Sequence, residues 1–325
     1  MNLSVSATVD LLPLREPFTL ARGTVTEIEL LLVELRDEHG HIGHIGRGEA
    51  PGLPYAGETG ASMQAQILEP GVTPQRLLEL LPPGGARNAL DCALWDLRAR
   101  QTGQRAWHLA GMADVQPVTT ALTLGIAPEA EYRERVARHT HMPLLKLKAN
   151  RERHVELVRI AREEHPTARL ILDANQSLDR ALLDQLTPEL HALGVELIEQ
   201  PVPVGSDEQL RGYGGAIPLA ADESCTDRIS LPALTGLYQF INIKLDKCGG
   251  LTEGLALAHE ARQRGFGLMV GNMGGTSLSM APHFLIAQQC AYVDLDAPLL
   301  FKWDREVAIE YAGAEMKLPE QGLWG

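Results

Sequence analysis

The sequence predicts an α/β fold: a modified TIM barrel of the (β/α)7β type with an α+β N-terminal capping domain. Two observations lead to this prediction. From about residue 117 onward, eight short apolar runs alternate with segments of helical periodicity, and this rhythm favours a parallel barrel over an open sheet. The chain has 325 residues, which suits a barrel with a smaller domain beside it. We expect the capping domain at 1–115, the barrel at 116–298, and a C-terminal segment at 299–325 that packs on the capping domain.

The first third of the chain has the pattern of a small, mostly antiparallel domain. Residues 2–12 and 27–35 read as strands that end near turn residues. Residues 59–70 and 74–81 look helical. The clearest amphipathic helix is ARNALDCALWDLRARQTG, residues 86–103, whose apolar positions recur at helical spacing. We therefore expect α and β elements to be mixed in this domain.

The barrel strands are expected where the apolar runs fall. They cover residues 118–124, 144–149, 169–174, 195–201, 217–222, 239–245, 267–272 and 292–296. Segments of helical period, such as HVELVRIAREEH and EGLALAHEARQRG, lie between most of them.

Composition and charge exclude several classes of partner. The chain has 29 Lys and Arg against 42 Asp and Glu, a net charge of −13, which argues against a nucleic-acid partner. An anionic substrate is still allowed, because a bound cation inverts the local field. The four cysteines have no CxxC spacing, so we read them as reduced thiols of a cytoplasmic protein.

No membrane partner is expected either. The N-terminal MNLSVSATVD has no basic region followed by an apolar one, as a signal peptide would have. The longest apolar runs, such as residues 30–33, are far too short to span a bilayer.

Charged residues close six of the eight expected strands, within LLKLKAN, LILDAN, ELIEQP, LAADES, INIKLDK and VDLDAP. They are Lys146, Lys148, Asp173, Glu199, Asp222, Lys244, Asp294 and Asp296. The carboxyl ends of the strands are where a parallel barrel keeps its active site. One such residue alone would be read as a solvated charge at a strand end. Six strands with an ionisable residue at the same end are not explained in that way, because crowded charges are costly unless they pair or hold a metal.

The order of these charges predicts a particular chemistry. The three carboxylates Asp173, Glu199 and Asp222 make a hard oxygen site that suits one Mg²⁺ per subunit. Lysines on separate strands are placed to flank a substrate, and the arrangement suits proton transfer at a carbon next to a carboxylate. A purely structural metal site would leave the lysines unexplained. A lysine base needs a lowered pKa, which nearby positive charge and partial burial provide.

With these motifs in place, the chain resembles the enolase superfamily and, within it, the muconate-lactonizing-enzyme subgroup. The pattern is KxK on the second barrel strand, D, E and D on the next three, and NIK on the sixth. A lysine or histidine base with Mg²⁺ is the known pattern of that superfamily. The chain is more specifically similar to the L-Ala-D/L-Glu epimerases, or dipeptide epimerases. The segments that carry this likeness are PFTLARGT, ARNALDCALWDL, ADESC, NIKLDKCGGLTE and DLDAP.

The resemblance implies roles for the charged residues at the strand ends. Asp173, Glu199 and Asp222 would bind Mg²⁺. Lys148 would act as the base on one face of the α-carbon, and Lys244 as the acid or base on the other.

The resemblance also implies the contacts that select the substrate. Lys146 would tune Lys148 and contact the substrate carboxylate, and Asp294 and Asp296 would bind the α-ammonium group of a dipeptide. Arg22 would pair with the side-chain carboxylate of a C-terminal Glu, for which the guanidinium fork is well suited.

Two further residues are named from their positions in the chain. Thr123, at the end of the first barrel strand, is a candidate substrate contact. Asp246, two residues beyond Lys244, is expected to make a hydrogen bond behind the site.

Two segments depart from the dipeptide-epimerase pattern. EAPGLPYAGET has no basic residue, and VGNMGGTSLSM matches only loosely. The expected preference for glutamate therefore rests on Arg22.

The preferred hypothesis is a Mg²⁺-dependent dipeptide epimerase in murein peptide metabolism, and we expect a homo-oligomer. One alternative is an o-succinylbenzoate synthase or N-succinylamino acid racemase, which would share the lysines and the metal ligands. Asp294 and Asp296 discriminate, since two carboxylates suit a free ammonium group and repel a succinyl carboxylate; muconate cycloisomerisation is disfavoured on the same grounds. Another alternative is a non-catalytic barrel that binds a small molecule, which the fold by itself allows.

Overall fold

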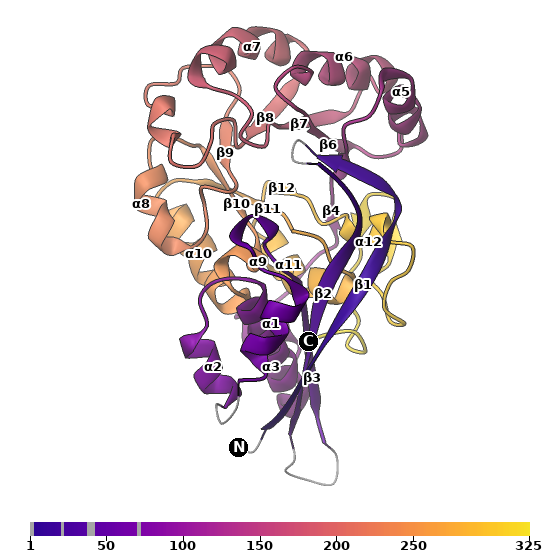
Figure 1. Cartoon of the computed structure of the whole chain (residues 1–325), viewed down its shortest axis with the longest axis vertical. Coiled ribbons are helices and arrows are strands. Elements are labelled where there is room, and N and C mark those ends of the chain that lie inside the picture. The colour runs from indigo at the N-terminus through magenta and orange to yellow at the C-terminus, as the bar shows by residue number, and fades with distance from the viewer. Residues whose placement is uncertain (1–2, 21–22, 38–42, 70–72) are drawn as a thin grey trace.

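The structure, a computed structural model, describes residues 3–20, 23–37, 43–69 and 73–325. A curled parallel sheet with helices on its outside forms one part of the molecule, and a long antiparallel ribbon with three helices forms the other (Figure 1). The ribbon lies along one side of the barrel, and a backbone hydrogen bond of 2.9 Å from Ile126 N to Thr19 O joins the two parts near its end.

The barrel sheet has eight strands that pair in chain order, each parallel to the next. They are β5 (Leu122–Leu124), β6 (Leu144–Lys148), β7 (Arg169–Asp173), β8 (Val195–Glu199), β9 (Leu219–Ala221), β10 (Phe240–Ile243), β11 (Gly267–Val270) and β12 (Tyr292–Val293). A backbone hydrogen bond of 2.7 Å from Ala121 N to Val293 O brings the two edge strands together. The sheet therefore curls round on itself, as the alternating pattern predicted.

Helices follow most of the barrel strands. They are α5 (Glu129–Arg138), α6 (His154–Glu164), α7 (Arg180–Ala192), α8 (Leu231–Leu234), α9 (Leu245–Cys248), α10 (Leu251–Gln263), α11 (Ser277–Ala287) and α12 (Ala297–Leu300), with 3-10 turns η2 (Asp207–Leu210) and η3 (Arg228–Ser230). β8 is followed by the short turn η2 in place of a full helix. No helix of the described residues is long and apolar enough to cross a membrane.

One expected barrel strand is divided in two. Residues 118–124 were expected as a single strand, but only β5 joins the barrel. The preceding β4 (Val118–Thr119) pairs instead with β14 (Glu315–Met316), which also pairs with β13 (Tyr311–Ala312). A short sheet outside the barrel thus ties the C-terminal segment to the start of the first barrel strand.

The antiparallel ribbon is longer than expected. β1 (Leu3–Leu20) pairs with β2 (Gly23–Asp37), and β2 pairs in turn with β3 (Ile45–Pro51). The register of β1 shifts between Pro13 and Phe18. Because β1 is an edge strand, the proline interrupts the ladder locally and does not end it.

Three helices cover the ribbon's base: α1 (Gly60–Ile67), α2 (Pro74–Leu80) and α3 (Gly85–Thr102), preceded by the 3-10 turn η1 (Pro54–Ala56); a short helix, α4 (Ala106–Leu109), follows α3. Close packing of α3 on β3 requires glycine. A Cβ at Gly46 would lie 2.2 Å from Ala93 O, and one at Gly48 would lie 2.0 Å from Ala89 O.

The C-terminal segment contacts both parts of the molecule. Trp324 is buried and donates from Nε1 to Cys92 O on α3 at 3.0 Å. Arg305 donates from Nε to Glu49 Oε2 of β3 at 2.9 Å. Glu49 also accepts from Thr276 N at 2.8 Å, at the start of α11 in the barrel. The domain boundaries at 115/116 and 298/299 stay a prediction.

We predict that Arg305→Met lowers the free energy of unfolding by about 3 kcal/mol. Glu49 is 1% exposed, and removing one partner of a buried pair leaves the other charge uncompensated, at a cost of about 3–5 kcal/mol. The lower end of this range applies because the Arg305 side chain is 21% exposed. Urea unfolding followed by circular dichroism measures the change.

Arg36→Met is the matched control, since Arg36 forms an exposed pair with Glu34. Such pairs contribute about 0–1 kcal/mol. Equal changes in the free energy of unfolding for the two substitutions would contradict the assignment of Arg305 and Glu49 as a buried, stabilising ion pair.

Candidate active site

The charged residues lie at the barrel mouth, which is the end of the barrel formed by the carboxyl ends of its strands. The alternation of side chains along each strand places them there. Side chains on a strand point alternately to its two faces, and a small apolar cluster fills the barrel interior: Ala121, Leu144, Ile171, Leu197, Ala220, Met269 and Tyr292. Asp173 comes two positions after Ile171 of this cluster, and Glu199 comes two positions after Leu197. The same step separates Leu144 from Lys146, Ala220 from Asp222, and Tyr292 from Asp294. The apolar layer thus sets the direction of the polar layer above it.

A cavity of about 470 Å³ lies at this mouth. It lies between the barrel and the capping region, which consists of the ribbon β1–β3 and the helices that cover its base. Ligand sites commonly have volumes in this range. The barrel contributes mainly polar residues: Thr123, Lys146, Lys148, Asn175, Asp222, Glu223, Lys244, Asn272, Asp294 and Asp296. The ribbon, η1 and the C-terminal segment contribute mainly apolar ones, among them Phe18, Leu20, Val25, Ile28, Tyr55, Leu300 and Phe301.

Lys148 and Lys244 stand on opposite walls of the mouth. Lys148 ends β6 and Lys244 follows β10, four strands further round an eight-stranded sheet. Lys148 Nζ lies 2.5 Å from Asp173 Oδ2, and Lys244 Nζ lies 2.7 Å from Asp222 Oδ2. A molecule held between these walls would present one face to each lysine.

Three strands lie between the lysines: β7 and β8 end in Asp173 and Glu199, and β9 is followed directly by Asp222. Burial, and after it the neighbouring Asp173 charge, raise the pKa of Glu199 to about 7, against the lowering effect of Lys146. The three carboxylates are therefore close enough to repel one another, and the site calls for added positive charge.

Lys146 supplies part of that charge. It is 1% exposed, and its Nζ lies 2.8 Å from both Asp294 Oδ2 and Glu199 Oε2, and 3.1 Å from Asp173 Oδ2. Burial alone would lower its pKa, but the three carboxylates outweigh burial and hold the pKa well above its usual range. Lys146 is thus a fixed cation in the wall of the cavity.

The lysine at the other wall is also held as a cation. Burial acts to lower the pKa of Lys244, but the facing Asp222 carboxylate raises it above its usual value. The lowered lysine pKa expected from the sequence is not found for this residue, because the nearest charge is an anion and lies in direct contact.

The carboxylates have the chemistry of a Mg²⁺ site. Three carboxylates on adjacent strands are hard oxygen donors, and the buried Glu199 Oε2 accepts no hydrogen bond of acceptable geometry despite its short distance to Lys146. Within the described ranges, no three His, Cys, Asp or Glu side chains lie close enough together to hold a metal ion as they stand. Each of the three carboxylates is instead turned toward a lysine. The donor set fits a divalent cation that competes with these lysines for the same oxygens.

Asp294 and Asp296 meet Thr123 where the sheet closes. Thr123 N donates to Asp296 Oδ2 at 2.6 Å, and Thr123 Oγ1 donates to Asp294 Oδ1 at 2.9 Å. Burial, and after it the neighbouring Asp294 charge, raise the pKa of Asp296 to about 7. Thr123 therefore holds the two aspartates, and two neighbouring carboxylates on the cavity wall favour a cationic group.

Asp246 makes the hydrogen bonds expected behind the site. Asn88 Nδ2, from α3 of the capping region, donates to its Oδ1 at 2.9 Å, and Met273 N donates to its Oδ2 at 3.1 Å. Met273 Sδ in turn lies 3.8 Å from Lys244 Nζ. Asp246 thus joins the capping region to the loop beside Lys244.

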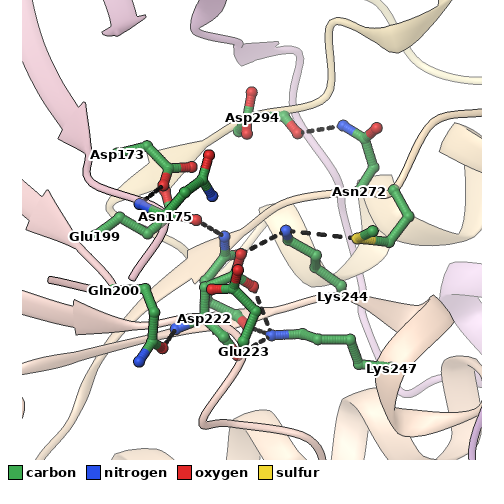
Figure 2. A network of polar contacts seen from close by, with 12 residues as sticks. Asp173, Asn175, Glu199, Gln200, Asp222, Glu223, Lys244, Lys247, Asn272 and Asp294 are labelled. Atoms are coloured by element: carbon green, nitrogen blue, oxygen red, sulfur yellow. Dashed lines mark hydrogen bonds and ion pairs between the residues drawn. The ribbon is translucent and has the colours of Figure 1, made fainter. Parts of the chain in front are cut away.

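Sequence reasoning missed Lys247. Lys247 is 2% exposed and contacts Asp222 on the side away from Lys244 (Figure 2). Asn242 Nδ2 donates to Glu199 Oε1 at 2.8 Å. Asn242, the first residue of the NIK motif, alternates with Lys244 along the chain and was therefore expected on the same face. Arg22 lies outside the described residues.

Comparison with known families covers most of the chain. The mandelate racemase / muconate lactonizing enzyme N-terminal domain matches residues 3–111, and the enolase C-terminal domain-like family matches residues 129–320. The L-Ala-D/L-Glu epimerase of Escherichia coli (strain K12) is 40% identical over 94% of this chain and 97% of its own. An N-acetyl-D-glutamate racemase of a Pseudoalteromonas species is 42% identical over 77% of this chain and 79% of its own.

Solved structures show the same two-part fold. An enolase family member of Agrobacterium tumefaciens, described as homologous to dipeptide epimerases and bound to sodium and L-Ala-L-Glu, superposes with a TM-score of 0.93 at 37% identity, covering 100% of both chains. A dipeptide epimerase of Methylococcus capsulatus, complexed with Mg and L-Arg-D-Lys, superposes with a TM-score of 0.88 at 31% identity, covering 100% of this chain and 99% of its own.

Proposed function

This chain belongs to the mandelate racemase and muconate lactonizing enzyme family of the enolase superfamily, and we propose that it is a Mg²⁺-dependent dipeptide epimerase, an isomerase. One observation carries the proposal. Lys148 and Lys244 stand on opposite walls of the mouth, and the three strands between them end in, or are followed directly by, the carboxylates Asp173, Glu199 and Asp222. This arrangement suits removal of a proton from one face of a carbon and its return to the other face.

In the proposed reaction a neutral Lys148 accepts the α-proton of the C-terminal residue and becomes an ammonium. The ammonium of Lys244 donates a proton to the opposite face, which inverts the centre. The reverse reaction exchanges the two roles. Mg²⁺, held by the three carboxylates at one ion per subunit, would stabilise the negative charge that develops on the substrate carboxylate. Lys146 keeps those carboxylates together and adds positive charge near Lys148 and the substrate carboxylate.

Recognition of the substrate is assigned to residues around these bases. Asp294 and Asp296, supported by Thr123, would bind the free α-ammonium group of the dipeptide. Arg22 would pair with the side-chain carboxylate of a C-terminal glutamate. The names of the similar Escherichia coli enzyme and of the Agrobacterium complex with L-Ala-L-Glu support Ala-Glu as the substrate.

The cellular setting is part of the proposal. Cys92, Cys225, Cys248 and Cys290 are free thiols, which supports a reducing cytoplasm. We place a homo-oligomeric enzyme there, acting on peptides from murein.

N-acylamino acid racemisation is the second candidate, because an N-acetyl-D-glutamate racemase is 42% identical. The two functions differ at the substrate nitrogen, which is charged in a dipeptide and neutral in an N-acyl amino acid. The paired carboxylates of Asp294 and Asp296 favour the charged group.

We predict that Asp222→Asn weakens Mg²⁺ binding and stops turnover, and that exhaustive treatment with EDTA stops the wild type. An amide oxygen is a poorer ligand for a hard dication than a carboxylate. Isothermal titration with Mg²⁺ and an epimerisation assay measure the two effects. Glu208→Gln, which removes an exposed acid paired with Arg211, is the control. Full activity after EDTA treatment would exclude the metal.

We predict that Lys148→Ala and Lys244→Ala each abolish epimerisation. Each variant should still exchange the α-proton of one enantiomer with deuterated water, and the two variants should differ in which enantiomer this is, since each loses the base on one face. Proton NMR of L-Ala-L-Glu and L-Ala-D-Glu follows the exchange. Equal exchange of both substrates by both variants would show that the two-base assignment is wrong.

We predict that Arg22→Met raises KM for Ala-Glu steeply and spares an Ala-dipeptide with an apolar second residue. Loss of one partner of a desolvated charge pair costs about 2–5 kcal/mol, or roughly thirty-fold or more in affinity. Steady-state kinetics with the two dipeptides measure the preference, and an unchanged preference for glutamate would remove Arg22 from the site.

N-acetyl-Ala-Glu tests the other end of the substrate. Acetylation removes the positive charge that Asp294 and Asp296 would bind, so turnover should fall to a similar extent. Equal turnover of acetylated and free Ala-Glu, together with racemisation of N-acetylglutamate, would favour the second candidate.

A further inference from the structure

We propose that Lys247 is a positioning residue that fixes the carboxylate of Asp222 for metal binding. This inference rests on the proposed function, because it concerns a proposed metal ligand. Lys247 does not contact the substrate in this proposal and acts only through Asp222.

The ammonium of Lys247 uses all of its donors on two neighbouring strands. It lies in α9, and its side chain is 1% exposed. Its Nζ donates to Asp222 Oδ1 at 2.7 Å and to Asn242 O at 3.0 Å, and it also donates to Asp222 O (Figure 2). A lysine ammonium has three donors, so both the backbone and the carboxylate of Asp222 are held by one cation.

The two carboxylate oxygens of Asp222 therefore have different partners. Oδ1 is bound by Lys247, which is buried behind the strand end, whereas Oδ2 faces Lys244, a residue of the cavity wall. The carboxylate cannot rotate without breaking the Lys247 contact, and so it presents Oδ2 to the cavity. This is the orientation that a ligand bound through a single oxygen requires.

Lys244 cannot perform this function itself. In the proposed reaction Lys244 gives up and takes back a proton, so the charge that faces Oδ2 changes during turnover. Lys247 lies outside the cavity and keeps a cation beside Asp222 throughout. A buried ammonium is costly unless it is paired, and an apolar side chain would fill the same space without that cost, so packing does not account for a lysine here.

The test is Mn²⁺ binding to the purified full-length chain, measured by electron paramagnetic resonance titration. Carboxylate sites that suit Mg²⁺ also suit Mn²⁺. Loss of a residue that orients a metal ligand typically lowers metal affinity by about 10–100-fold. Lys247→Met, which keeps the length of the side chain and removes its donors, should weaken binding by that factor, and Lys247→Arg, which keeps the charge, should restore part of it.

A double substitution shows whether the effect passes through Asp222. In an Asp222→Asn background, Lys247→Met should cause no further loss of Mn²⁺ affinity if Lys247 acts only by orienting that side chain. Lys302→Met, at an exposed lysine, should bind Mn²⁺ as the wild type does. Urea unfolding in EDTA gives the folded fraction of each variant, so that affinities refer to folded protein.

The outcomes separate this inference from the proposed function. A wild type that binds no Mn²⁺ would overturn the metal site and both proposals with it. A Lys247→Met variant with wild-type affinity, or additive losses in the double variant, would overturn the positioning role alone. If Lys247→Met fails to fold, Lys247→Gln takes its place in the same titration, and failure of both to fold would make Lys247 a folding residue and overturn the proposal.

Discussion

The pairing of lysines with carboxylates at one end of a barrel is the constraint on which the rest of the structure depends. Anions at the ends of three adjacent strands repel one another, and burial makes that repulsion stronger. Lys146 lies among them, and Lys148 and Lys244 flank them. Because Lys148 and Lys244 are the proposed bases, the groups that neutralise the proposed metal ligands include the groups proposed to move protons. Any cation that binds the carboxylates changes the electrostatic surroundings of both bases.

The parts outside the barrel line one side of this charged mouth. The ribbon and η1 contribute mainly apolar side chains to the cavity, and charges interact more strongly beside apolar groups than in bulk water. Two contacts hold these parts in place from behind, Asn88 with Asp246 and Arg305 with Glu49. The capping region is thus joined to the barrel through buried polar groups, whose geometry is more specific than that of an apolar interface.

Much of this could be predicted from the sequence because strand periodicity fixes direction. A charge two positions after a buried apolar residue must share its face, which is why Asp173 and Glu199 were identified as site residues. Lys247 was not found, because a lysine in the helix after a strand reads as a solvated residue, and only the turn into α9 brings it under Asp222. The division of residues 118–124 also escaped prediction, since pairing of β4 with β14 depends on a segment almost 200 residues away.

The aspartates proposed to bind the substrate amine belong to the last strand of the barrel, and their support, Thr123, belongs to the first. Thr123 and Asp294 are 171 residues apart in the chain, whereas the two proposed bases and the three proposed metal ligands lie on or directly after the strands between them. In the proposed assignment, chemistry and selectivity are therefore carried by different segments of the polypeptide. During synthesis on the ribosome, the proposed amine subsite would be completed last, because Asp294 and Asp296 follow the groups proposed to transfer protons.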